Sequence, residues 1–78
     1  HNQLFNIRTS LFRDFIKLKF LNLDKNLITF IETYSFYNLH LLENLVLSNN
    51  KLKYIENETF NGLYQLKQLH LNNNYLEL

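Results

Sequence analysis

The chain has 78 residues, which is enough for one small domain and too few for two lobes with a catalytic cleft between them. Its 18 Leu and 13 Asn, beside a single Gly, are typical of a repeat protein. The lack of Cys excludes a disulfide framework and a thiolate zinc site in these residues. Eight basic and seven acidic residues give a net charge of +1, so no basic field is available to hold nucleic acid.

A period of 24 residues organises the whole chain. Its clearest marker is an asparagine, found at Asn2, Asn26, Asn50 and Asn74. Leucines precede this asparagine by eight, five and three residues in each complete unit, and further apolar columns follow it. We therefore predict a single array, with a partial repeat at 1–17, repeats at 18–41 and 42–65, and a partial repeat at 66–78.

Each unit contains a leucine-rich segment that alternates along the chain, as in Leu45-Val46-Leu47. Alternation at period two predicts a short strand with its leucines in the core. Segments one repeat apart are expected to pair in parallel, because the arc over residues 50–65 is long enough for the crossover. Polar residues interrupt that arc too often for a long helix, so we expect turns, extended chain or a single helical turn there.

Two columns have clear roles in this arrangement. A short amide can bond backbone groups where a strand bends away from its ladder, so the four asparagines are expected to stack as a structural asparagine ladder. Further along the arc, a column of Phe12, Phe36 and Phe60 predicts a stack of aromatic rings that fills the convex half of the core.

The chain resembles the leucine-rich repeat family over residues 2–78, where each unit follows the pattern L-x-x-L-x-L-x-x-N-x-[L/I]-x-x-I-x-x-x-x-F-x-x-[L/F]-x-x. Its 24-residue length and phenylalanine column are similar to the subclass found in extracellular animal proteins such as Toll-like receptors, Slit-type guidance proteins and small matrix proteoglycans. The resemblance implies an α/β-type leucine-rich repeat solenoid. Short parallel strands would form the concave face, and the convex side would be mostly irregular or turn-rich, with little helix.

Strand residues that point away from the core are the first candidates for a binding surface. A solenoid presents them as an extended concave face, which suits another protein better than a small molecule. Apolar or amphipathic anchors with polar surroundings are typical of interface hot spots. The alternative is that these are ordinary strand residues on a solvated face. The candidate ligand-binding residues are Phe20, Asn22, Asn44, Val46, Gln68 and His70.

Further aromatic residues fall on the arc, outside the core columns. A contiguous exposed patch of such residues marks association, whereas partial burial between adjacent coils would make them part of the fold. Both interpretations stay open from the sequence. The residues are Phe5, Phe30, Tyr34, Tyr37, Tyr54, Tyr64 and Tyr75.

No constellation of catalytic or metal-ligating residues is expected. The three histidines fall in different columns and should not converge on one metal ion, and the single glycine, Gly62, excludes a glycine-rich phosphate loop. Glu32 and Glu56 stack one repeat apart, which could raise a carboxylate pKa, although solvated carboxylates on an open flank are the simpler account. We expect no enzymatic activity, no cofactor and no catalytic or metal-binding residue.

The ends of the chain lack the polar caps that repeat arrays need. No signal peptide is visible, and no apolar stretch approaches the roughly 18 residues of a membrane span. We expect an internal fragment of a longer protein that exposes apolar residues of its outer coils and self-associates through its uncapped ends. Those residues are Leu4, Ile7, Leu71 and Leu76.

The sequence favours a non-catalytic protein–protein interaction module, from an extracellular receptor, adhesion or matrix protein, that binds a protein ligand on its concave face. One glycosylation sequon, Asn57-Glu58-Thr59, lies on the arc and fits an extracellular or cell-surface location. The alternatives are a structural spacer or homotypic assembly segment, and a cytoplasmic leucine-rich repeat adaptor, which the lack of Cys allows.

Overall fold

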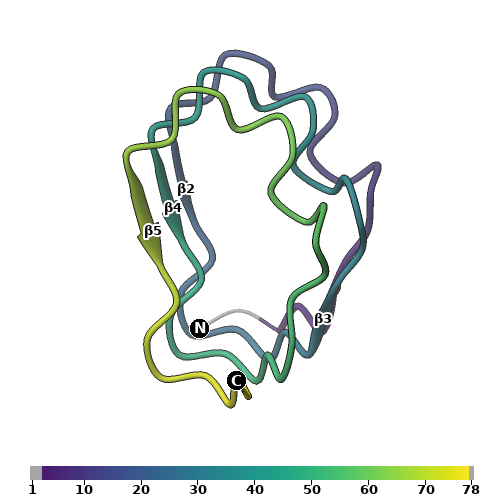
Figure 1. Cartoon of the computed structure of the whole chain (residues 1–78), viewed down its shortest axis with the longest axis vertical. Coiled ribbons are helices and arrows are strands. Elements are labelled where there is room, and N and C mark those ends of the chain that lie inside the picture. The colour runs from purple at the N-terminus through teal and green to yellow at the C-terminus, as the bar shows by residue number, and fades with distance from the viewer. Residues whose placement is uncertain (1–2, 78) are drawn as a thin grey trace.

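The computed structural model describes residues 3–77 and forms a short solenoid of three stacked coils (Figure 1). Each coil is a loop with a strand on one side and an arc that returns on the other side. The described residues contain no helix. Successive reverse turns replace it, for example where the Leu39 N–H donates to the Phe36 carbonyl oxygen at 3.0 Å. The predicted solenoid with a turn-rich arc is therefore confirmed.

Three parallel strands form a sheet on one side of the solenoid, in the order β2 (Phe20–Asn22), β4 (Asn44–Val46) and β5 (Gln68–His70). Register partners follow the sequence period, as Leu21, Leu45 and Leu69 show. The ladder continues past the strands, because the Leu23 N–H lies 2.8 Å from the Val46 carbonyl oxygen. The leucine-rich segments thus pair in parallel, as their alternation predicts.

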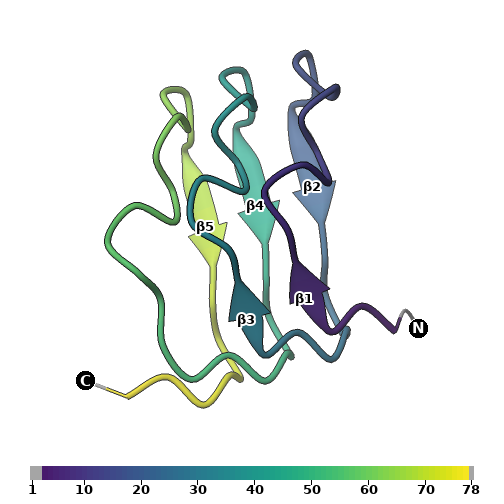
Figure 2. The ribbon, with the colours of Figure 1, turned by 90° about the vertical axis from the view of Figure 1, so that its right-hand side faces the viewer.

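A second parallel sheet lies on the arc side, where β1 (Asn6–Ile7) pairs with β3 (Phe30–Ile31). Between these first two coils the Glu32 N–H donates to the Ile7 carbonyl oxygen at 2.8 Å. The third coil forms no strand here, and its trace swings away from β3 (Figure 2). Among the described residues, no backbone hydrogen bond joins residues 53–58 to the second coil. The sequence predicts only extended chain or turns in this region, so the second sheet is a finding of the structure.

The leucine columns of the central coil are fully buried, but burial in the outer coils differs from the sequence prediction. Leu76 is exposed, as expected, and Leu4 and Leu71 are half-buried. Ile7 is predicted to be exposed and is instead fully buried. The reason is the arc-side sheet, which places Ile7 in register with Ile31 inside the core.

The phenylalanine column forms the predicted stack. The ring centroids of Phe12 and Phe36 are 5.9 Å apart with an interplanar angle of 15°. Those of Phe36 and Phe60 are 6.1 Å apart at 10°. Phe36, in the middle of the stack, is fully buried, so this column forms part of the core, as predicted.

The asparagine column links neighbouring coils, with Asn26 and Asn50 buried and Asn74 half-buried. The Asn50 amide nitrogen donates to the carbonyl oxygen of Leu47 in its own coil and to that of Leu23 in the preceding coil, both at 3.0 Å. Its Oδ1 atom accepts the Ile28 N–H at 3.1 Å. One side chain thus satisfies backbone groups of two coils that the sheet leaves without partners.

The same geometry recurs at the other described asparagines of the column. Asn74 Oδ1 accepts the Leu52 N–H at 3.0 Å, and Asn26 Oδ1 accepts the Leu4 N–H at 3.2 Å. Asn2, the fourth predicted member, lies outside the described residues. Each of the three described asparagines therefore links its coil to the preceding one.

Left-handed backbone closes two kinds of turn. Lys25, Asn49 and Asn73 occupy the same column and have φ angles of 59°, 59° and 62°. Asparagine adopts this region more readily than lysine does, so Lys25 is the strained member of the column. Gly62 has φ of 96°, and a Cβ there would lie 2.1 Å from the Tyr37 carbonyl oxygen. Only glycine permits this close approach of the third coil to the second.

Candidate protein-binding surface

The six predicted ligand-binding residues lie together on the sheet face, by which we mean the outward-pointing side chains of β2, β4 and β5. Residues two apart along a strand point to the same side, so each strand contributes two residues. Register partners form one row of Phe20, Asn44 and Gln68 and a second row of Asn22, Val46 and His70.

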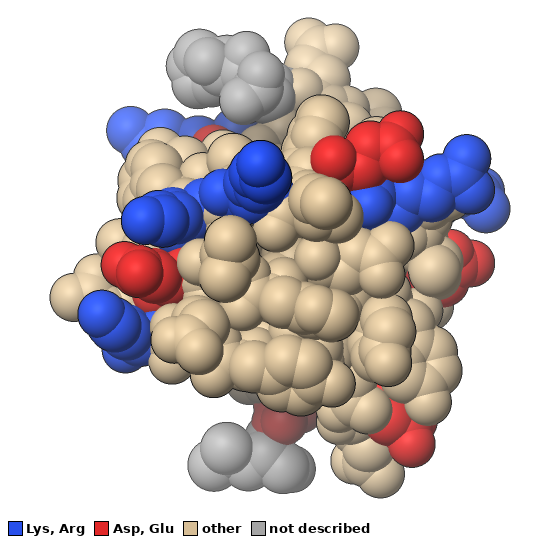
Figure 3. Space-filling model, turned by 90° about the horizontal axis from the view of Figure 1, so that it is seen from above, with Lys and Arg blue, Asp and Glu red and all other residues tan. Residues whose placement is uncertain are grey.

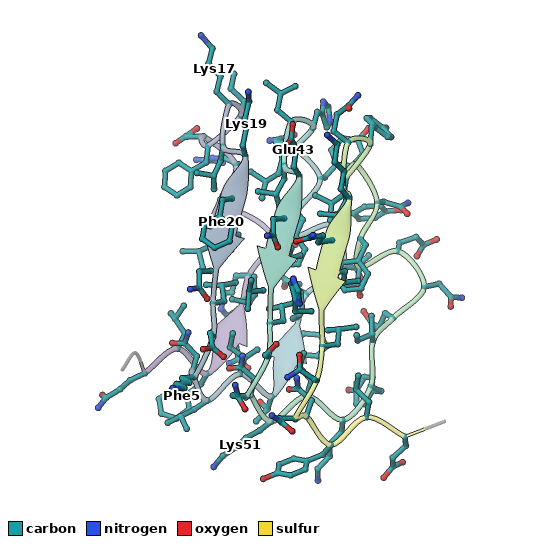
Figure 4. The ribbon with its side chains drawn as sticks, turned by 90° about the vertical axis from the view of Figure 1, so that its left-hand side faces the viewer. Phe5, Lys17, Lys19, Phe20, Glu43 and Lys51 are labelled. Atoms are coloured by element: carbon teal, nitrogen blue, oxygen red, sulfur yellow. The ribbon has the colours of Figure 1, made fainter. Side chains whose placement is uncertain are left out.

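Phe20 is the main apolar feature of the sheet face. Its side chain is 53% exposed, and its ring lies over the outer side of β2, away from the core (Figure 4). Val46 is half-buried on the neighbouring strand, and His70 is exposed on β5. Covering a phenylalanine ring with a partner would contribute about 2 kcal/mol from apolar burial alone. Phe20 is thus the best-placed anchor on this face.

Two amides cross the middle of the sheet face. The Asn44 side-chain nitrogen donates to Gln68 Oε1 at 3.0 Å. Asn44 Oδ1 is buried and has no hydrogen-bond partner among the described residues. A buried acceptor without a partner reduces stability, so this position is not optimised for the isolated fold. Asn22 differs from its neighbours, because its Oδ1 atom accepts the Asp24 N–H at 2.9 Å and helps to build the turn that follows β2.

Charged residues stand where the arcs lead into the strands. Lys17, Lys19 and Glu43 project from this end of the sheet face (Figure 4). Lys67 Nζ lies 4.0 Å from Glu43 Oε1, but the two side chains are 70% and 42% exposed, so the pair contributes little to stability. These charges flank Phe20 and can orient a partner. Lys19, Glu43 and Lys67 share one solvent-facing column in the sequence, but the six candidate residues predicted from the sequence do not include that column.

The opposite end of the sheet face is closed by side-chain hydrogen bonds. Alternation along the strand would direct the Ser48 side chain to solvent on the same side as Val46. Ser48 is instead buried, and its hydroxyl donates to Asn72 Oδ1 at 2.7 Å. Asn49 Nδ2 donates to Asp24 Oδ1 at 2.9 Å. These groups already satisfy one another, so the binding surface is limited to the two rows on the strands.

The glutamates of the arc do not form a like-charge pair. Glu32 Oε1 accepts the Thr9 N–H at 2.6 Å, and this hydrogen bond, supported by the Thr9 side chain, lowers the pKa of Glu32 below its ordinary value. The Thr33 hydroxyl donates to Glu56 on the next coil. The hypothesis that stacking raises a carboxylate pKa is therefore wrong for Glu32, because donors surround it.

Most of the arc aromatics are exposed, and Phe30 is half-buried at 6.5 Å from the Tyr54 ring. Partial burial between coils thus accounts for Phe30 alone. At the sequon, Asn57 is exposed while the Thr59 side chain is fully buried. The exposed members of the set are Phe5, Tyr34, Tyr37, Tyr54, Tyr64 and Tyr75.

The charges of the molecule are mixed in sign. Seen from the end at which the arcs lead into the strands, blue and red side chains lie around the rim and uncharged ones occupy the middle (Figure 3). Residues 3–77 contain no cluster of three or more His, Cys, Asp or Glu that could hold a metal ion. The same part of the chain has no helix of the length and apolar character that a bilayer crossing requires.

Stacked coils, a parallel strand ladder, buried asparagines and a turn-rich return together define a repeat solenoid of the kind that serves as a non-catalytic interaction fold. A leucine-rich repeat family model matches residues 1–52 and 41–78. The chain belongs to the leucine-rich repeat family. A comparison with curated proteins finds no match.

Proposed function

We propose that the chain is part of an extracellular or cell-surface protein and that its sheet face binds a protein ligand. The observation on which this depends most is Phe20, a half-exposed ring on β2 in register with the incompletely bonded Asn44. An exposed aromatic anchor with polar neighbours is the arrangement found at protein–protein hot spots.

The form of the surface supports a protein over a small molecule. Both rows run across three strands in continuous register, so the surface is extended and follows the stacking direction. Small-molecule sites are concave and bury most of their ligand. An extended array of side chains along the stacking direction is instead the kind of surface that a solenoid offers to a protein partner.

The proposed location depends on two features. The repeat resembles that of extracellular members of the family, and the sequon asparagine, Asn57, is exposed on the arc, away from the sheet face. A glycan there would leave Phe20, Val46 and His70 free to bind. Expression in a secreting eukaryotic host and mass spectrometry at Asn57 would test this location. An unmodified asparagine in every secreted molecule would contradict it.

Photo-crosslinking tests the binding surface even though the protein ligand is unidentified. A benzophenone side chain at Val46 is expected to give a discrete protein adduct on cell-surface fractions. The double substitution Phe20→Ala and His70→Ala should abolish that adduct, while the thermal unfolding midpoint stays unchanged because both side chains are exposed. The matched control carries benzophenone at Glu58, which is exposed on the arc. Equal adducts at both positions, or an adduct indifferent to the double substitution, would overturn the proposal.

A second candidate function, homotypic assembly, can be tested on the 78-residue chain through its outer strand. All three residues of β5 are exposed, and Leu69 is 37% exposed although its equivalent Leu45 is fully buried. An open strand edge with apolar neighbours is a template for pairing with another chain. Light scattering at tens of micromolar should therefore show association of the 78-residue chain. The substitution Leu69→Lys should suppress it, and a monodisperse monomer of the parent chain would contradict this candidate.

A further inference from the structure

A groove with a volume of about 880 Å³ opens on the arc face and is lined by residues of all three coils. Its lining includes Arg13, Tyr34, Tyr37, Asn61 and Tyr64, and none of the six sheet-face residues. Its size lies within the range of ligand-binding clefts. The groove is therefore a second concave feature, separate from the proposed protein-binding surface.

The tyrosines of the groove belong to a chain of neighbouring aromatic rings. The rings of Tyr34 and Tyr37 are perpendicular, with centroids 6.0 Å apart. His40 lies 5.7 Å from Tyr37 at 82° and 4.9 Å from Tyr64. The three tyrosines are 43%, 47% and 70% exposed. Perpendicular neighbours leave recesses with an aromatic face on one side, which suit a compact apolar ring.

Tyr34 is held in an unfavourable backbone conformation. Its φ angle is 64°, in the left-handed region that bulky residues rarely adopt. Such residues persist only where the surroundings fix them, and they cluster at binding sites. A tyrosine at this position reduces the stability of the turn and directs an aromatic ring into the groove. This combination indicates that the ring has a role beyond folding.

The walls of the groove are fixed by contacts between coils. The Asn38 side-chain nitrogen donates to the Arg13 carbonyl oxygen at 3.2 Å, which joins the first two coils. Gly62 brings the third coil against the Tyr37 backbone, because a Cβ there would lie 2.1 Å from the Tyr37 carbonyl oxygen. A groove that is already formed loses little conformational entropy when it binds.

Arg13 is the one charged residue among those that line the groove, and no Asp or Glu lines it. The other polar residues of the lining are Ser, Thr, Asn and Tyr, whose side chains can both donate and accept hydrogen bonds. Arg13 makes no ion pair with a carboxylate of residues 3–77. The complementary occupant offers acceptors and negative charge.

We propose that this groove binds an acidic, proline-rich peptide in the polyproline II conformation. Such a peptide exposes all its backbone carbonyl oxygens to donors, and its prolines have no N–H that needs an acceptor. Proline rings fit between aromatic side chains, and this is an established mode of peptide recognition. An acidic residue beside the prolines pairs with Arg13. The chain itself contains no proline, so the occupant is another molecule.

Fluorescence anisotropy provides the test, with a labelled peptide of two glutamates followed by six prolines as the probe. Its dissociation constant for the full 78-residue chain is expected to be about 100 μM. Replacing the glutamates by lysine is expected to lower the affinity. A peptide with alanine in place of every proline is the probe control and is expected not to bind.

Three variants separate binding from folding. Tyr64→Ala removes an exposed ring and should weaken binding by about tenfold. Tyr34→Asn removes the ring and introduces a residue that tolerates the left-handed backbone. It should weaken binding as much as Tyr64→Ala does, while the thermal unfolding midpoint is unchanged or higher. Tyr75→Ala removes a comparably exposed ring outside the groove and should leave binding unchanged.

Each contrary result overturns the proposal. The alanine peptide could bind as well as the proline peptide, or Tyr34→Asn and Tyr64→Ala could bind it as tightly as the parent chain does. An acidic oligosaccharide that binds in a Tyr64-dependent way, and that the proline peptide does not displace, would assign the groove to sugars instead.

Discussion

On the sheet side each coil is bonded to the next through the backbone, from Leu23 to Val46 and from Leu47 to His70, both at 2.8 Å. On the arc side, among the described residues, a strand pair joins only the first two coils. The Lys51 N–H still donates to the Ile28 carbonyl oxygen at 2.9 Å, and beyond it the third coil departs from β3 (Figure 2). The asparagines are the physical source of the difference. They repeat in every described coil and fix the turn after each strand, whereas the side-chain hydrogen bonds of the arc, such as that from Asn38 to the Arg13 carbonyl oxygen, do not repeat from coil to coil.

In the third arc, side-chain packing replaces the backbone pairing that joins the first two arcs. The Phe36–Phe60 stack continues into it, and the Phe30–Tyr54 contact covers its edge. Aromatic contacts tolerate displacement better than a hydrogen-bond ladder does. The comparison indicates that the sheet side is a fixed platform for binding and that the arc side can vary in shape from coil to coil.

The largest expected effect is at the centre of the arc packing. Phe36→Ala should reduce the free energy of unfolding by about 4 kcal/mol, because Phe36 is fully buried and supports the rings on both sides. Urea denaturation would measure this value. Tyr75→Ala, at an exposed position outside this packing, is the control and should cost less than about 1 kcal/mol. Equal losses would mean that the stack does not hold the arc.

The asparagine ladder should show the next largest effect. Asn50→Ala is expected to reduce the free energy of unfolding by about 3 kcal/mol, since it leaves buried carbonyl groups and the Ile28 N–H without partners. The same urea titration checks it, with the exposed arc residue Asn57→Ala as the matched control. A loss below about 1 kcal/mol would show that water replaces the side chain and that the ladder is not what distinguishes the two sides.

A stabilising substitution is available in the turn after β2. Lys25→Asn should raise the free energy of unfolding by about 1 kcal/mol, because the equivalent positions in the other coils are Asn49 and Asn73 in the same left-handed conformation. Calorimetry would detect a higher unfolding midpoint. Lys51→Asn changes the same residue types where φ is not positive, and it should produce no increase. A decrease at Lys25 would contradict the strain assigned to this turn.

The smallest expected effect concerns pH. Because hydrogen bonds from Thr9 hold the pKa of Glu32 below its ordinary value, the folded state binds this proton less tightly than the unfolded chain does. The stabilisation is therefore fully present above the ordinary pKa and is lost as the pH falls through the folded pKa, below about pH 4.5. Glu32→Gln should flatten this part of the stability curve in acid titrations. An unchanged curve for Glu32→Gln would contradict the assignment.

The sequence predicts the sheet side well, because periodic columns have only one way to stack. Leucines at fixed spacing produce the strands, and an asparagine in every unit produces the ladder. The arc-side sheet could not be predicted in this way. Each arc has an isoleucine at the equivalent position, in the dipeptides Asn6-Ile7, Phe30-Ile31 and Tyr54-Ile55. Only the first two of these segments form strands that pair with each other among the described residues. The choice depends on which neighbour each arc packs against, and the period does not encode this.

The limits of prediction at the candidate site have similar causes. Alternation along the strands places Phe20, Val46 and His70 on one face, because side-chain direction there follows from the period. It does not apply at the turn, where Ser48 is buried. Nor does it reveal the groove, which depends on left-handed backbone at Tyr34 and on packing across three coils.

Amide hydrogen exchange tests most directly whether the sheet side, with its asparagine ladder, is a fixed platform. Two sets of backbone amides are compared. The first set donates to ladder asparagines (Ile28 and Leu52) or across the sheet (Leu47). These amides should exchange at least about 100-fold more slowly than those of Ile55 and Glu56 in the third arc. Equal protection of the two sets would contradict this account, because it would show that the coils open as one unit and that the two sides do not differ.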